Sequence, residues 1–247
     1  EAAFMVLPIV TSLIYQETSG FAFLITIILC LAIGIPLTWK KPTRKAFYTK
    51  EGFVTVALSW IVLSIMGAIP FVISHSIPNP IDALFETVSG FTTTGASILN
   101  NVEALPHCML IWRSFTHWIG GMGVLVFILS LLPLTGGYHM NLMKAESPGP
   151  SVSKLAPKVQ STAKILYTIY FAMTVVQMIL LLLGGMPLFD TICTAFGTAG
   201  TGGFGIKNDS MASYSPYLQN VITVFMILFG VNFNAYFFIL TKKFAQA

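Results

Sequence analysis

Long runs of apolar residues alternate with short polar stretches along this 247-residue chain. Five runs are each long enough for the roughly 20 residues that a helix needs to cross a hydrocarbon core about 30 Å thick. They cover residues 20–39, 52–74, 109–133, 163–185 and 216–241. A sixth run, residues 2–15, is shorter, and we interpret it as a spanning helix whose beginning is missing from the chain. The pattern predicts an all-α polytopic membrane protein.

The composition agrees with a membrane location. Hydrophobic residues make up 55% of the chain and charged residues 9%, whereas a soluble domain carries about 25% charged residues. The chain therefore lacks the polar side chains that a water-facing surface requires. Cys30, Cys108 and Cys193 stand in apolar contexts without metal-binding or disulfide spacing, and we interpret them as buried small hydrophobic residues.

Basic residues predict which side of the membrane each loop occupies. Of the thirteen Lys and Arg, all but Arg113 and Lys207 lie at residues 40–50, 144–164 and 242–243. The helix count places these three clusters on one side, which the positive-inside rule makes cytoplasmic. The net charge of +4 therefore reflects topology, and no nucleic-acid partner is expected.

Two stretches on the outer side match each other. Residues 81–98 are IDALFETVSGFTTTGASI, and residues 189–206 are FDTICTAFGTAGTGGFGI. At a constant offset of 108 the identical pairs are Asp82 with Asp190, Thr93 with Thr201, Gly95 with Gly203 and Ile98 with Ile206. Apolar runs flank both stretches, so the sequence predicts an internal repeat of helix, re-entrant segment and helix.

The glycines of the second stretch also match the G-x-G-x-x-G pattern of a dinucleotide-binding turn, as Gly200-Thr201-Gly202-Gly203-Phe204-Gly205. That turn needs a strand before it, a helix after it and an acidic residue about 20 positions further on. Phe225 stands at that distance, and the first copy of the repeat lacks the motif. We therefore reject the nucleotide interpretation.

A re-entrant loop explains the same residues better than a plain glycine-rich turn does. Asp82 and Asp190 follow prolines and are predicted to cap the N-termini of two pore helices. From Asp82 to Ser89 a helix rises about 12 Å, to roughly mid-membrane. The chain must then return as non-helical backbone, which glycine permits and which is tolerated at that depth where it lines a water-filled path. The freed carbonyls can replace the hydration shell of a cation.

Three stretches resemble the TrkH/TrkG/KtrB family of bacterial potassium-uptake proteins: FETVSGFTTTGASI (85–98), WRSFTHWIGGMGV (112–124) and GTAGTGGFG (197–205). The resemblance runs along nearly the whole chain. It implies a pseudo-fourfold ion pore of four helix–pore-loop–helix repeats, preceded by two extra helices, in the bacterial inner membrane. It also implies a homodimer, a cytoplasmic nucleotide-binding regulatory ring of the TrkA/KtrA type, K⁺ as the transported ion, no covalent cofactor and no enzymatic activity.

Carried over to this chain, the selectivity filter comprises Thr92, Thr93, Thr94 and Gly95 in the first repeat and Gly200, Thr201, Gly202 and Gly203 in the second. The expected division is two leading helices with a basic loop (1–50), the first repeat (51–135), a cytoplasmic linker (136–162) and the second repeat (163–247). Two of the family's four repeats are present. Either the other half belongs to a longer chain, or two copies complete one pore. The family's gating loop has no counterpart here.

Several polar and small residues remain to be explained. Glu86 and Arg113 are predicted to form a structural brace, because charges at membrane depth are usually paired. His117 is expected to be a packed, hydrogen-bonded histidine. Gly120, Gly121 and Gly123 form a small-residue stripe that allows close helix packing.

Other functions remain open. Sodium or mixed-cation transport is the alternative within the same superfamily, although Gly95, where family members that admit sodium tend to have Ser, favours potassium. A half-length assembly subunit that does not conduct alone is the other alternative. The four histidines show no HxxxH spacing or carboxylate pairing, so an intramembrane enzyme is not supported.

Overall fold

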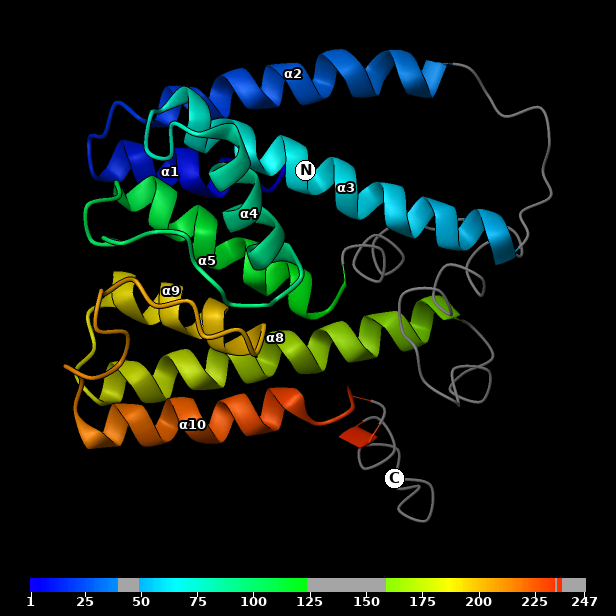
Figure 1. Cartoon of the computed structure of the whole chain (residues 1–247). Coiled ribbons are helices and arrows are strands. Elements are labelled where there is room, and N and C mark those ends of the chain that lie inside the picture. The colour runs from blue at the N-terminus through cyan, green and yellow to red at the C-terminus, as the bar shows by residue number, and fades with distance from the viewer. Residues whose placement is uncertain (40–48, 124–158, 234, 237–247) are drawn as a thin grey trace.

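The computed structural model describes residues 1–39, 49–123, 159–233 and 235–236. The regular elements in these residues are all helices (Figure 1). They are α1 (Val6–Ile14), α2 (Gly20–Trp39), α3 (Thr49–Ile73), α4 (Pro80–Phe91), α5 (His107–Gly121), α8 (Val159–Leu183), α9 (Leu188–Ala199) and α10 (Pro216–Gly230). The predicted fold class, an all-α polytopic membrane protein, is confirmed.

Three of the described helices are long and apolar enough to cross a membrane: Gly20–Trp39, Phe53–Ile73 and Lys164–Leu183. α10 is a shorter apolar helix. The run at residues 2–15 forms only the nine-residue α1, which falls short of the roughly 20 residues that a span needs. The structure does not describe residues 124–133 of the predicted span at 109–133, nor most of the linker 136–162.

The internal repeat is visible in the positions of the helices. α4 and α9 have 12 residues each and begin 108 positions apart. α3 and α8 have 25 residues each, and α5 and α10 have 15. The order of long helix, short helix and second helix therefore occurs twice.

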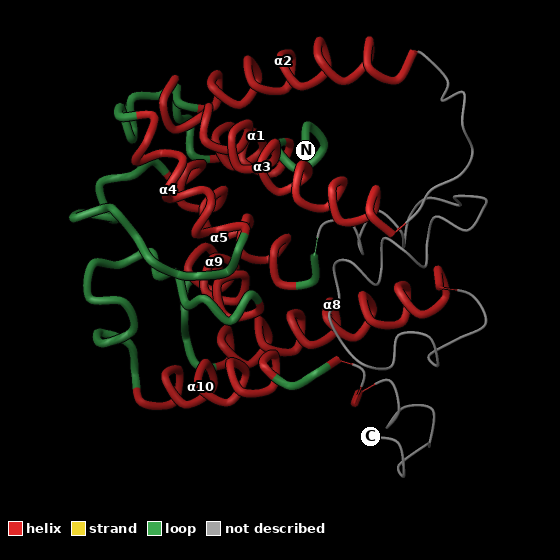
Figure 2. Tube along the Cα trace, turned by 45° about the vertical axis from the view of Figure 1, so that its right-hand side comes forward, coloured by secondary structure: helices red, strands yellow, loops and turns green. Residues whose placement is uncertain are grey.

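Figure 1 shows how the helix ends are sorted. The C-terminal end of α2 and the N-terminal ends of α3 and α8 lie on one side, at the right of the view, and α10 runs from the opposite side toward the middle. Both short helices begin at the opposite side and end near the middle of the molecule, and their connections return to the side where they began (Figures 1 and 2). Most residues of the predicted basic clusters lie outside the described part.

The predicted caps of the short helices are wrong by a few residues. The N-cap of α4 is Asn79, whose side chain accepts a hydrogen bond from Ile81 N at 3.0 Å. Pro80 then occupies the first turn, where its missing N–H is harmless. Asp82 lies inside the first turn, where its charge still interacts favourably with the helix dipole. Asp190 is likewise inside the first turn of α9, after Pro187 at the N-cap.

Helix α5 forms the centre of the described structure. Eleven of its fifteen residues are buried, and it contacts α1, α4 and α9. By contrast, α2 exposes large apolar side chains, among them Ile28 and Leu37, as expected for a helix that faces lipid. α5 therefore lies where both halves of the repeat can contact it.

Glu17, in the connection between α1 and α2, caps the N-terminus of α5. Its carboxylate accepts hydrogen bonds from His107 N at 2.7 Å and Cys108 N at 3.0 Å. The His107 ring lies 2.9 Å from the same carboxylate and stacks on Tyr15 with ring centroids 3.9 Å apart. The leading helices are thereby fastened to α5 at its first turn.

Replacing Glu17 with Gln should lower thermal stability at neutral pH, and the difference from the wild type should shrink in acid. Burial acts to raise the pKa of Glu17, but hydrogen bonds from the backbone of Cys108 and His107 outweigh it and lower the pKa below the ordinary value of 4.5. A carboxylate with a lowered pKa stabilises the folded state fully above its unfolded pKa, and the contribution is lost as pH falls through the folded value.

The measurement is the melting temperature of both proteins in detergent, at neutral pH and well below pH 4.5. Other carboxylates titrate equally in both proteins, so only the difference between the two counts. A difference that stays constant across this range would contradict the capping role.

Candidate ion-coordination site

The backbone after α4 and after α9 has the same conformation. Thr93 and Thr201 have φ of 55° and 58°, and Gly95 and Gly203 have φ of 78° and 74°. All four values lie in the left-handed region, which non-glycine residues adopt at a cost of roughly 1–2 kcal/mol. Each threonine is paired with a glycine two positions later, at the offset of 108 found in the sequence. The two predicted filter segments thus share positive φ at these two positions.

The hydrogen bonds that end the two short helices also match. Thr92 N donates to Val88 O at 2.8 Å, and Gly200 N donates to Phe196 O at 3.3 Å. One residue later, the N–H of each left-handed threonine donates to the carbonyl three positions before it. The last turn of each short helix therefore ends with the same two hydrogen bonds, whereas the next one differs: Thr94 N donates to Ser89 O in the first repeat, and Gly203 N donates to Gly197 O in the second.

The two predicted filter segments contact each other through their backbones. A Cβ built on Gly95 would lie 2.0 Å from Gly202 O, a distance that real Cβ atoms do not reach. A Cβ built on Gly202 would lie 3.0 Å from Thr93 O. Glycine is required at residue 95 for this approach as well as for its positive φ.

Several backbone oxygens of these segments are available to a ligand. Among the described residues, no hydrogen bond is found to the carbonyl oxygens of Thr92–Gly95 or of Thr201–Gly203. Thr92, Thr94, Thr201 and Gly203 are exposed. Carbonyl oxygens without protein partners are the ligands that potassium filters use. The geometry is therefore compatible with cation coordination.

The predicted pairing of Glu86 with Arg113 is present and extends further than expected. Arg113 Nε donates to Glu86 Oε1 at 2.5 Å, and Arg113 Nη1 donates to Gly205 O at 2.7 Å. Glu86 also accepts from Ser97 Oγ at 3.0 Å and from Ile98 N at 2.9 Å. Both charged side chains are at least 97% buried. One ion pair therefore links α4, α5 and the returns of both repeats.

The second repeat lacks this ion pair. At the offset of 108, Thr194 stands in the place of Glu86. Its buried hydroxyl has no partner among the described residues. α5 therefore braces both loops through the side chains of the first repeat.

The glycine stripe of α5 allows the close approach that was predicted, and its neighbours are the loops themselves. A Cβ on Gly120 would lie 2.1 Å from Phe91 O and 3.0 Å from Thr93 Cγ2, and one on Gly121 would lie 2.9 Å from Gly200 Cα. His117 differs from the prediction of a hydrogen-bonded histidine. It is fully buried, and neither ring nitrogen has a hydrogen-bond partner among the described residues.

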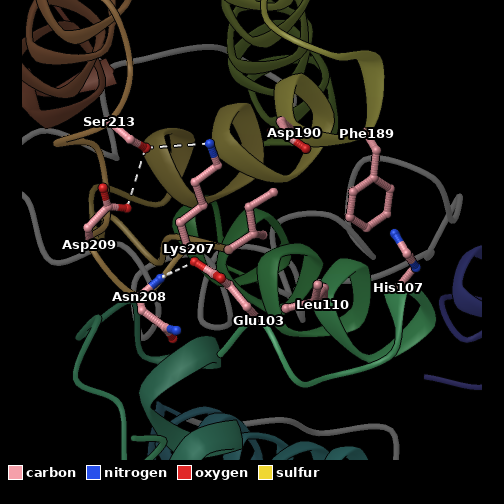
Figure 3. A pocket seen from close by; sticks show the side chains of 10 residues that line it. Glu103, His107, Leu110, Phe189, Asp190, Lys207, Asn208, Asp209 and Ser213 are labelled. Atoms are coloured by element: carbon pink, nitrogen blue, oxygen red, sulfur yellow. Dashed lines mark hydrogen bonds between the residues drawn. The ribbon is translucent and has the colours of Figure 1, made fainter. Parts of the chain in front are cut away.

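The outer loops of the two repeats are also joined. Asn208 Oδ1 accepts from Val102 N at 2.7 Å, and Asn208 N donates to Glu103 Oε1 at 3.0 Å. Lys207, one of the two outer basic residues, places Nζ 4.1 Å from the centroid of the Tyr214 ring. An open pocket of about 510 Å³ lies here (Figure 3). Its lining comprises Glu103, His107, Leu110, Phe189, Asp190, Ile206, Lys207, Asn208, Asp209 and Ser213.

These contacts could not be read from the sequence. Asn208 and Ser97 carry no motif. The only signal was indirect, because two outer basic residues required partners. Within the described residues, no group of three or more His, Cys, Asp or Glu side chains could hold a metal ion. The candidate ligands at this site are the backbone oxygens of the two filter segments.

The fold and site define a polytopic helical membrane protein built on a repeated unit of long helix, short helix and second helix. Comparison with known proteins gives the family. The model of the TrkH family, described as a cation transport protein, matches residues 19–245. The chain therefore belongs to the TrkH family of cation transport proteins.

Individual relatives agree. The chain is 40% identical over 244 residues to the Trk system potassium uptake protein TrkH of Salmonella typhimurium, covering 97% of this chain and 50% of the relative. It is 36% identical to the potassium uptake protein TrkG of Escherichia coli, covering 97% and 50%. The crystal structure of the potassium transporter TrkH from Vibrio parahaemolyticus superposes with a TM-score of 0.79 at 30% identity, covering 96% of this chain and 48% of that one. The chain spans about half the length of these relatives.

Proposed function

We propose that this chain supplies two of the four pore loops of a potassium-uptake protein in the bacterial inner membrane. The observation that carries the proposal is the pair of Thr/Gly segments, which touch at Gly95 and Gly202. Among the described residues, the carbonyl oxygens of Thr92–Gly95 and Thr201–Gly203 accept no hydrogen bond. The names of the relatives, potassium uptake proteins, support potassium as the ion.

The proposed mechanism uses the backbone. Carbonyl oxygens of Thr92–Gly95 and Gly200–Gly203 replace part of the hydration shell of K⁺ as it leaves the outer water. The C-terminal ends of α4 and α9 point toward the middle of the molecule, and their negative dipole ends add a favourable potential for a cation. Sodium is disfavoured while the number and field strength of the oxygens suit the larger ion.

Two loops cannot surround an ion, so the proposal requires two more. The relatives are about twice as long as this chain, which favours two further repeats in the same polypeptide over a pore made by two copies. The exposed filter residues Thr92, Thr94, Thr201 and Gly203 form the surface that those repeats would cover.

The proposed surroundings follow from the family. The apolar faces of α2, α3 and α8 contact lipid, with the basic clusters on the cytoplasmic side. The working form is a homodimer that docks on a cytoplasmic nucleotide-binding regulatory ring of the TrkA/KtrA type. The matched family is one of transporters, and no enzymatic step is proposed. K⁺ is cargo, and its ligands would be the filter residues.

The protein, expressed as its gene encodes it, should restore growth of uptake-deficient bacteria at low potassium. An inside-negative potential of 100 mV is worth about 2.3 kcal/mol per charge, which supports roughly fiftyfold accumulation at 1.4 kcal/mol per decade. Rubidium uptake measured in the same cells gives the rate, and cells that carry the empty vector are the control.

Protein that reaches the membrane but restores no growth would falsify the transport proposal. Growth that depends on sodium, with sodium uptake exceeding rubidium uptake, would favour the sodium or mixed-cation alternative. Flux that appears only when a second polypeptide is co-expressed would favour the assembly-subunit alternative.

A further inference from the structure

His117 faces the second filter segment at close range. A Cβ built on Gly202 would lie 2.0 Å from His117 Cε1 and 2.4 Å from His117 Nδ1. Gly202 thus leaves a space beside its Cα that the imidazole fills. Thr93 O approaches the same space, at 3.0 Å from the built Cβ. The ring therefore lies where the two filter segments meet.

The same ring holds the residue that follows the filter. The Phe204 ring packs against His117 with centroids 4.0 Å apart, and the Arg113 guanidinium carbon lies 3.6 Å from the Phe204 centroid. Arg113 and His117 are four positions apart on α5 and so share one face of that helix. Phe204, which is 2% exposed, packs against both side chains, and Arg113 Nη1 also donates a hydrogen bond to Gly205 O.

Hydrogen bonding does not explain why a histidine occupies this position. Neither ring nitrogen has a partner among the described residues, and a buried polar group without a partner is destabilising. The side chains and backbone around His117 must therefore account for a histidine at this position. The structure packs it against Gly200, Gly202 and Phe204, which lie at or just after the end of α9.

We propose that His117 is a positioning residue for ion selectivity: its imidazole acts as a spacer that fixes the backbone of Gly202 against α5 and against Thr93 O. The inference rests on the proposed potassium transport and adds a determinant to it from outside the filter segments. Without the spacer, the Gly202 backbone can move toward α5, and the carbonyl positions that distinguish potassium from sodium shift with it.

The first test is His117→Ala in the protein as its gene encodes it, with rubidium uptake measured against sodium competition. We expect the preference for rubidium over sodium to fall at least about tenfold, a change of about 1.4 kcal/mol, with the amount of protein in the membrane nearly unchanged. Trp112→Phe is the matched control. Trp112 is a buried ring of the same helix, bonded to Gly67 O of α3, and its replacement should lower stability without altering ion preference.

The second test uses the space beside the Gly202 Cα that the imidazole fills. Gly202→Ala alone should abolish most uptake and lower the melting temperature, because its Cβ meets the His117 ring. Combined with His117→Ala, the same substitution should recover uptake to nearly that of His117→Ala and recover the melting temperature. Gly95→Ala is the control that His117→Ala should not rescue, because its Cβ meets Gly202 O.

If His117→Ala does not accumulate, His117→Asn replaces it, since Asn removes the atom nearest Gly202 and keeps a polar branched side chain. Unchanged ion preference in the accumulating variant, or no rescue of Gly202→Ala, overturns the proposal. If the wild type transports no potassium, the proposed function fails. The rescue of the melting temperature then still decides whether His117 positions Gly202.

Discussion

Replacing Gly95 with Ser should remove most of the preference for potassium over sodium, at least about tenfold or 1.4 kcal/mol. The residue has φ of 78°, a conformation that costs a side chain roughly 1–2 kcal/mol. The added Cβ would also lie 2.0 Å from Gly202 O and 2.8 Å from Gly202 C. Gly202 O and Gly202 C are backbone atoms, so the two filter segments must move apart to make room for the Cβ. Selectivity should therefore fall more than total flux.

The measurement is rubidium uptake against increasing sodium. Gly34→Ser is the matched control, because a Cβ on Gly34 of α2 meets nothing within 4 Å. Gly120, which the sequence alone would offer as a control, is unsuitable because its Cβ would strike Phe91 O. Unaltered selectivity in a Gly95→Ser protein that reaches the membrane would place the filter elsewhere.

Removing either partner of the Glu86–Arg113 ion pair should strongly destabilise the protein. Both groups are buried, and truncation of one partner of a buried pair typically costs about 3–5 kcal/mol because a charge is left uncompensated. Each single alanine variant should therefore show a large loss of stability. The double variant should lose less than the sum, because it leaves no lone buried charge.

Thermal unfolding in detergent is measured for the wild type, the two single alanine variants and the double variant, which together form a double-mutant cycle. The Glu86→Gln variant separates the effect of charge from that of hydrogen bonding. Its amide can still accept hydrogen bonds from Ser97 Oγ and Ile98 N, while the charge opposite Arg113 is gone. Thr194→Val is the control at the equivalent position of the second repeat, where the buried hydroxyl has no partner among the described residues and its loss should cost little. Strict additivity of the two alanine substitutions would contradict the brace.

Some of the local structure followed from the sequence because local rules dictated it. The run at residues 20–39 forms α2 with those bounds, since an uninterrupted apolar stretch of that length has few alternatives in a membrane. The cap of α4 was misplaced because Asn79 and Asp82 both suit an N-terminus, and only the observed bond to Ile81 N decides between them. The run at residues 2–15 forms a helix only from Val6 onward, because apolar composition alone does not set where a helix begins.

By itself, the sequence determined the membrane class, the order of helices and the repeat at an offset of 108, because hydrophobic run length and self-similarity are properties of the chain alone. It also indicated Gly95 and Gly203, whose residue type suits a left-handed return, but not the left-handed conformation of Thr93 and Thr201, which β-branched residues disfavour. Only the tertiary structure decided that Gly95 meets Gly202, that Arg113 reaches Gly205 and that His117 fills the space beside Gly202. These partners lie 85 to 107 positions apart in the sequence, and packing of one repeat against the other, which no local pattern encodes, brings them together.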